Sequence, residues 1–129
     1  MKLNNLLSVA AIYMAVVGFG FILFPEAFGR GALPADPSPT LISYLRLWGS
    51  PLIGIAVLNW KVRKEGPSKA LDAIVVGNIV GFAVMTLLDA WGLLNEARPV
   101  TKVFVVVHLV FTLAFIIIGR KRLSKNNMV

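Results

Sequence analysis

The chain is short, apolar and basic, and these properties exclude most classes of soluble protein. It has 129 residues, of which 57% are hydrophobic and only 15% are charged, and its mean hydropathy is +0.79. A single domain of this composition needs a bilayer as its solvent. Lysine and arginine outnumber aspartate and glutamate by 13 to 6. Because the basic residues lie between and after long apolar runs, we interpret them as orientation signals and contacts with anionic lipid, and we expect no nucleic-acid partner.

Two apolar runs in the first half of the chain have the length of a spanning helix. The first, Leu6 to Phe24, contains no charged residue, and the second, Leu41 to Trp60, contains Arg46 as its one charged residue. About 20 residues with a rise of about 1.5 Å each cross a hydrocarbon core of about 30 Å. We expect the first run to be an uncleaved span, because its 19 residues exceed the apolar region of a usual signal peptide.

Two further runs occupy the second half. The third, Ala73 to Leu88, is flanked by Asp72 and Asp89, and the fourth, Val103 to Gly119, carries His108 as its only ionisable group. With their flanking residues these runs also reach spanning length. The sequence therefore predicts an all-α, four-helix transmembrane bundle, a single domain over residues 1–129, with spans at about 4–24, 40–60, 70–92 and 100–119.

Prolines separate the predicted helices. The stretch Pro25 to Thr40 holds four prolines and two glycines, a composition that predicts a loop. Ser38 and Pro39 suit the cap and first turn of the second helix. Further breaks are expected at Gly66-Pro67-Ser68 and at Arg98-Pro99.

Basic residues are unequally divided between the two sides of a four-span chain. The side that holds the termini and the second connection carries nine basic residues, and the opposite side carries four. The nine are Lys2, Lys61, Arg63, Lys64, Lys69, Arg120, Lys121, Arg122 and Lys125, and the four are Arg30, Arg46, Arg98 and Lys102. The positive-inside rule therefore predicts that both termini are cytoplasmic.

Small residues mark the seams at which we expect the helices to pack, since association in lipid depends on close approach and polar contacts. The candidates are Gly18 and Gly20 in the first helix, Gly49 and Ser50-x-x-x-Gly54 in the second, and Gly77-x-x-x-Gly81 in the third. Two interpretations of these glycines stay open: packing inside the bundle, and a face that joins the chain to a second copy or to a larger membrane complex.

The residue inventory argues against several kinds of chemistry. One histidine and no cysteine cannot build a metal site or a bis-histidine haem site within one chain, so we expect no metal and no cofactor. The sequence contains no dinucleotide-binding, P-loop or zinc-protease motif, and none of its hydroxyl residues lies in a recognisable nucleophile motif. We therefore expect that the protein is not an enzyme.

The organisation of the chain is similar to that of a known group. A first helix ending at Phe24-Pro25 is followed by a Gly/Pro loop, the segment LRLWGSPLIGIAVLNW from Leu45 to Trp60, a basic turn, the segment GNIVG and a last helix with one histidine. This resembles the DoxX-like and related small four-helix bacterial membrane proteins over most of the chain, with Arg46 as the best-matching position. The resemblance implies a multi-pass protein of the bacterial inner membrane and little about its chemistry.

Four polar residues of the spans are candidate binding residues: Arg46, Asp89, His108 and Asn78. The three ionisable ones are expected at similar depth, in the outer third of the membrane, where each is costly unless paired or hydrated. In one interpretation Arg46 and Asp89 form a structural ion pair and His108 is neutral. In another, they line an outward-facing pocket in which Arg46 holds an anionic or carbonyl group while His108 and Asp89 tune protonation; in a third, the side chains reach separately for the interface.

Two classes of function follow from this arrangement. The first is a binding or accessory role, in which an outer-leaflet polar pocket holds an amphipathic ligand or the bundle packs against a larger membrane complex. The alternative is an oligomeric pathway for a small solute or ion. A conducting pathway usually lines several polar residues through the whole depth, and the inner half of this bundle offers few, so we favour the first class.

Overall fold

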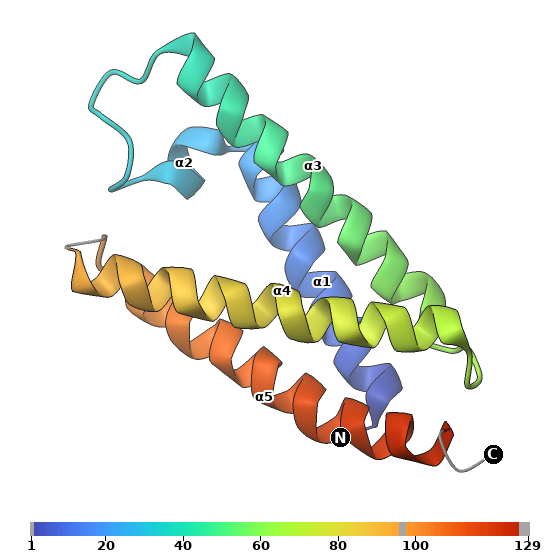
Figure 1. The fold of residues 1–129 in the computed structure, drawn as a ribbon. Coiled ribbons are helices and arrows are strands. Elements are labelled where there is room, and N and C mark those ends of the chain that lie inside the picture. Colours follow the sequence, from blue (N-terminus) through green and yellow to red (C-terminus); the bar gives the residue numbers. More distant parts are fainter. Residues whose placement is uncertain (1, 96–97, 127–129) are drawn as a thin grey trace. The chain divides into compact units, whose positions relative to one another are not determined.

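The computed structural model describes residues 2–95 and 98–126, and these residues contain helices and short connections but no strand (Figure 1). The expected all-α fold is thereby confirmed. The helices are α1 (Leu3–Leu23), α2 (Pro25–Gly29), α3 (Pro39–Val62), α4 (Lys69–Leu94) and α5 (Thr101–Asn126).

Four of the described helices are long and apolar enough to cross a bilayer. They are α1, α3, α4 and the part of α5 from Thr101 to Gly119. Each begins within one residue of the start expected from the sequence. The short helix α2 was not expected, because its segment was predicted as loop, and α5 continues past the expected end of the last span to Asn126.

The described residues form two compact units, whose relative placement is not determined. One unit, Leu7–Lys61, holds most of α1 together with α2 and α3, and the other holds the α4–α5 hairpin together with the first residues of α1. The expectation of a single domain over residues 1–129 stays a prediction.

Serine side chains fix the starts of α3 and α4. The backbone N–H of Leu41 donates to Ser38 Oγ at 3.3 Å, and that of Leu71 donates to Ser68 Oγ at 3.2 Å. Each bond satisfies one of the N–H groups that the first turn of a helix leaves without a partner. The predicted cap at Ser38 is therefore confirmed.

Within the Leu7–Lys61 unit, α1 and α3 approach each other at two glycines. A Cβ at Gly18 would lie 2.9 Å from the carbonyl oxygen of Gly49 and 2.9 Å from Ile53 Cγ1, and a Cβ at Gly49 would collide with the carbonyl oxygen of Gly18. The two backbones are thus in direct contact, as expected for small residues at a helix seam in lipid. In contrast, a Cβ at Gly54 meets no described atom within 4 Å.

The α4–α5 hairpin packs through aromatic rings. Phe82 of α4 is fully buried and stacks on Phe111 and Phe115 of α5, with ring centroids 4.5 Å and 5.9 Å apart. Closer to the start of α4, a Cβ at Gly119 of α5 would lie 2.6 Å from Val75 Cγ1. The close glycine contact between these helices is therefore on α5.

The glycines of α4 do not form that seam. A Cβ at Gly77 or Gly81 meets no described atom within 4 Å, so the expectation that Gly77-x-x-x-Gly81 marks the packing of this helix is not met in the α4–α5 hairpin. The residue that α4 presents to α5 is Phe82, the chain neighbour of Gly81, which stacks on Phe111 and Phe115.

Large apolar side chains remain exposed on every spanning helix. Examples are Val16 and Phe19 on α1, Leu47 and Trp48 on α3, Leu87 and Leu88 on α4, and Val106 and Val110 on α5. So much exposed apolar surface suits contact with lipid chains and not with water. Together with the four spanning helices, it shows a small polytopic membrane protein.

Candidate functional site

The short helix α2 is held against the end of α1 by an aromatic ring that lies on a glycine. The ring of Phe28 occupies the space that a Cβ at Gly20 would need, and its centroid lies 5.7 Å from that of Phe21. Pro25 is the first residue of α2, where its missing N–H is no loss. These contacts fold the chain back at the membrane edge directly after α1.

Two glycines, Gly29 at the end of α2 and Gly31 in the loop after it, set the path of this loop. A Cβ at Gly29 would lie 2.6 Å from Leu33 Cδ1 and 3.1 Å from Leu45 Cδ1, so this glycine lets the loop approach α3. Gly31 has φ of 81°, a conformation that side-chain-bearing residues rarely adopt. The loop is thereby turned toward the first half of α3.

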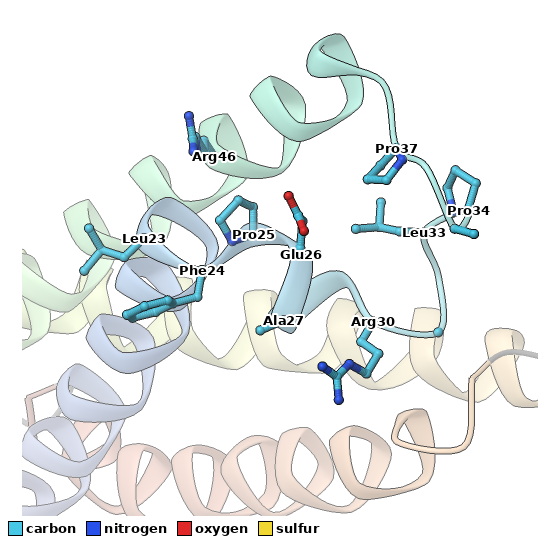
Figure 2. A pocket seen from close by; sticks show the side chains of 12 residues that line it. Leu23, Phe24, Pro25, Glu26, Ala27, Arg30, Leu33, Pro34, Pro37 and Arg46 are labelled. Carbon is cyan, nitrogen blue, oxygen red and sulfur yellow. The ribbon is translucent and has the colours of Figure 1, made fainter.

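A pocket of about 630 Å³ lies between this loop, the end of α1 and α3. Its wall combines apolar side chains and prolines with three charged residues, Glu26, Arg30 and Arg46. Figure 2 shows the carboxylate of Glu26 and the guanidinium of Arg30 on opposite sides of α2, with Arg46 on α3. The volume is within the range of about 300–1,000 Å³ that is usual for small-molecule sites.

Arg46 is the charged residue of this pocket that belongs to a spanning helix. It is exposed and makes no hydrogen bond or ion pair with any residue of the Leu7–Lys61 unit. It lies seven positions after Pro39, the first residue of α3, which corresponds to about 10 Å along the helix. A guanidinium at this depth needs water, an anion or the membrane interface, because an isolated charge in hydrocarbon is costly.

The second polar site is the contact between α4 and α5. His108 Nδ1 lies 2.6 Å from Asp89 Oδ2, and the two side chains are only 9% and 23% exposed. An ionised carboxylate only accepts hydrogen bonds, so His108 donates through Nδ1–H. The structure thus brings together two of the four residues selected from the sequence.

Two threonines continue this contact along the hairpin. Thr86 Oγ1 and Thr112 Oγ1 lie 3.4 Å apart, while Thr86 donates to the carbonyl oxygen of Phe82 and Thr112 to that of His108, both at 2.8 Å. Each hydroxyl is therefore already satisfied within its own helix, and the strong link between the helices is the Asp89–His108 bond.

Aromatic side chains enclose the imidazole of His108. Phe104 stacks on it with ring centroids 5.9 Å apart, and Phe82 lies tilted against it at 6.0 Å. Arg98 lies over the ring of Phe104, with its Cζ 5.8 Å from the ring centroid. The histidine is thus fixed by one carboxylate and two rings, an arrangement that suits a structural role in joining α4 to α5.

The two remaining predicted residues have separate outcomes. Asn78 is buried on α4 and donates from Nδ2 to the carbonyl oxygen of Ile74 at 2.8 Å. Arg46 lies in the other unit from Asp89, so the predicted Arg46–Asp89 ion pair and a joint pocket with His108 stay predictions. The carboxylate for which Arg46 was one expected partner is bonded to His108.

Sequence reasoning missed Glu26 and Arg30 as pocket residues and Thr86 as a seam residue. For Glu26 and Arg30, the sequence did contain a signal for a short helix. In Phe24-Pro25-Glu26, proline takes the first position of the helix and an acidic residue lies in its first turn. A short helix at that point turns the chain back and places both charged residues in the wall of the pocket.

Comparison of the chain with protein-family models, with curated proteins and with solved structures finds no match.

Proposed function

We propose that this membrane protein has a binding role and that the pocket around Arg46 holds the anionic head of an amphipathic ligand. The observation that carries the proposal is the exposed guanidinium of Arg46, which has no ion-pair partner within the Leu7–Lys61 unit although it belongs to a spanning helix. A guanidinium suits carboxylate or phosphate because it donates two parallel hydrogen bonds to two oxygens.

The pocket's composition supports an amphiphile over a simple anion. Arg30, Arg46 and Glu26 together give the wall one net positive charge, which favours an anionic head. Leu23 and Phe24 line the same pocket and are 61% and 62% exposed, so they offer apolar surface to a hydrocarbon tail that extends into the bilayer. A ligand with both parts uses the whole pocket.

We further propose that the pocket opens on the outer side of a bacterial inner membrane. The support is the excess of basic residues on the opposite side, nine against four, together with the resemblance to the DoxX-like group. In this orientation Arg46 lies in the outer leaflet and the turn between α3 and α4 lies in the cytoplasm.

Three probes that differ in head and tail test the ligand class. Oleate carries both a carboxylate and a tail, methyl oleate has the same tail without the charge, and acetate has the charge without the tail. Native mass spectrometry of the protein released from mild detergent should show adducts with oleate at concentrations where methyl oleate and acetate give few. Equal adducts with oleate and methyl oleate would exclude an anionic-head site, and equal adducts with acetate would indicate a small-anion site.

Two variants test the residue. Arg46→Gln should lower oleate occupancy about tenfold, because it removes a charge-assisted hydrogen bond that contributes roughly 1.5–3 kcal/mol. Lys64→Gln removes the same charge from the turn after α3, outside the pocket, and should leave occupancy unchanged. Full oleate binding by the Arg46 variant would refute the proposal.

A further inference from the structure

A second hollow lies on the same pair of helices, toward the other end of α3. It measures about 450 Å³ and runs along α1 and α3 within the Leu7–Lys61 unit. Small side chains leave room for it, namely Ala11 and Ala15 on α1 and Ala56 on α3. At about 1.5 Å per residue, the stretch of α1 from Ala11 to Phe19 gives it a length of about 12 Å.

The lining is apolar except at one end. On α1, the lining reaches as far as Phe19, which is apolar. On α3, it reaches Trp60 and the charged residue Lys61, close to the end of the helix. Lys61 lies in the last turn of α3, is exposed and makes no hydrogen bond or ion pair with any residue of the Leu7–Lys61 unit. Tryptophan beside lysine at the end of a spanning helix is typical of the membrane–water interface.

Shape alone gives such a hollow no preference among lipids, because every phospholipid brings acyl chains as apolar as leucine. The preference must come from the head, and the only charged residue of the lining is Lys61. Lys61 therefore gives this end of the groove a positive charge. Positive charge close to the bilayer surface favours anionic lipid heads.

We infer that this groove is a binding site for one anionic phospholipid, with an acyl chain along α1 and α3 and the phosphate group at Lys61. The site is distinct from the pocket around Arg46, which lies near the opposite end of α3, and it does not depend on that pocket's ligand. The two sites would place one amphiphile in each leaflet against the same helix pair.

Tryptophan fluorescence tests the site directly, because Trp60 is part of its lining. The variant Trp48→Phe/Trp91→Phe leaves Trp60 as the only tryptophan, and both replaced side chains are more than two-thirds exposed. The full chain is reconstituted in phosphatidylcholine vesicles that contain equal mole fractions of brominated phosphatidylglycerol or brominated phosphatidylcholine. Bromine quenches tryptophan on contact, so quenching reports which lipid occupies the groove.

The expected preference of Trp60 for brominated phosphatidylglycerol is about fivefold, the factor that one lysine near an anionic surface provides. Lys61→Gln should remove this preference, while Lys64→Gln, which removes a charge outside the lining, should keep most of it. Equal quenching by the two brominated lipids would overturn the inference, and so would equal losses in the two lysine variants.

A filled groove gives a second, independent test. Ala15→Leu should lower the quenching of Trp60 by either lipid, whereas Val16→Leu, on the neighbouring exposed position outside the lining, should not. If Ala15→Leu instead changes the oligomeric state and leaves quenching intact, the groove is a protein interface and the inference fails. Arg46→Gln should leave the Trp60 signal unchanged, which separates this site from the proposed function.

Discussion

The bond between Asp89 and His108 is expected to contribute a large share of the coupling between α4 and α5. The contact is short, at 2.6 Å, and the histidine side chain is only 9% exposed. Polar contacts between membrane helices couple by about 0.6 kcal/mol on average and by up to about 1.7 kcal/mol. Because this one involves a carboxylate, we expect a coupling energy of about 1.5 kcal/mol, near the upper end.

A double-mutant cycle measures this energy. Asp89→Leu removes the acceptor, His108→Phe removes the donor but keeps a ring against Phe82 and Phe104, and the double variant removes both. Asp89→Asn is the conservative variant, since its amide oxygen still accepts from Nδ1–H, and it should lose less than half as much stability as Asp89→Leu. Reversible unfolding in mixed micelles gives the free energies.

The neighbouring threonine pair is the matched control. Thr86 and Thr112 face each other on the same two helices, but their hydroxyl oxygens are 3.4 Å apart and each already bonds to its own helix. Their coupling should stay below about 0.5 kcal/mol, within the usual scatter of additivity. If the Asp89–His108 cycle gives a value no larger than the threonine cycle, the proposed role of this bond is refuted.

Three further changes test other parts of the fold, each by unfolding in mixed micelles. Gly49→Val should lower the free energy of unfolding by about 1–3 kcal/mol, because the valine side chain would collide with the backbone of Gly18. An unchanged stability would show that α1 and α3 do not meet there. Gly54→Ala, in open space on the same helix, should be neutral or stabilising by roughly 0.5–1 kcal/mol, and a clear loss would reveal an unseen neighbour. Ser68→Ala should cost about 1 kcal/mol through loss of the cap on α4, whereas Ser68→Asp should retain most of that stability.

The number and extent of the spanning helices could be predicted from the sequence because the bilayer sets their length. Each predicted span starts within one residue of the helix in the structure, and the cap at Ser38 was identified in advance. The helix α2 was missed because five residues with a proline at the start lack the periodicity that identifies longer helices. The proline that suggested a loop is in fact compatible with the first position of a helix.

The packing partners were harder to predict, because a sequence pattern indicates which face of a helix packs but not which other helix packs against it. Gly18 and Gly49 were correctly placed at a seam, yet the GxxxG pattern of α4 lies away from α5. The sequence placed Arg46, Asp89 and His108 at similar depth, but depth alone did not show whether His108 or Arg46 is the partner of Asp89. That choice depends on which helices are adjacent, and the hairpin makes α5 the neighbour of α4.

In the proposed topology the chain crosses the membrane four times and presents the Arg46 pocket on the side opposite the termini. The absence of cysteine from the sequence allows a direct test with single cysteines and a membrane-impermeant maleimide, applied to right-side-out and inside-out vesicles. The three positions are Ala35 in the loop before α3, Gly66 between α3 and α4, and Val100 before α5. Ala35→Cys and Val100→Cys should react only in right-side-out vesicles and Gly66→Cys only in inside-out ones, whereas reaction of all three from one side, or the reverse pattern, would contradict the account.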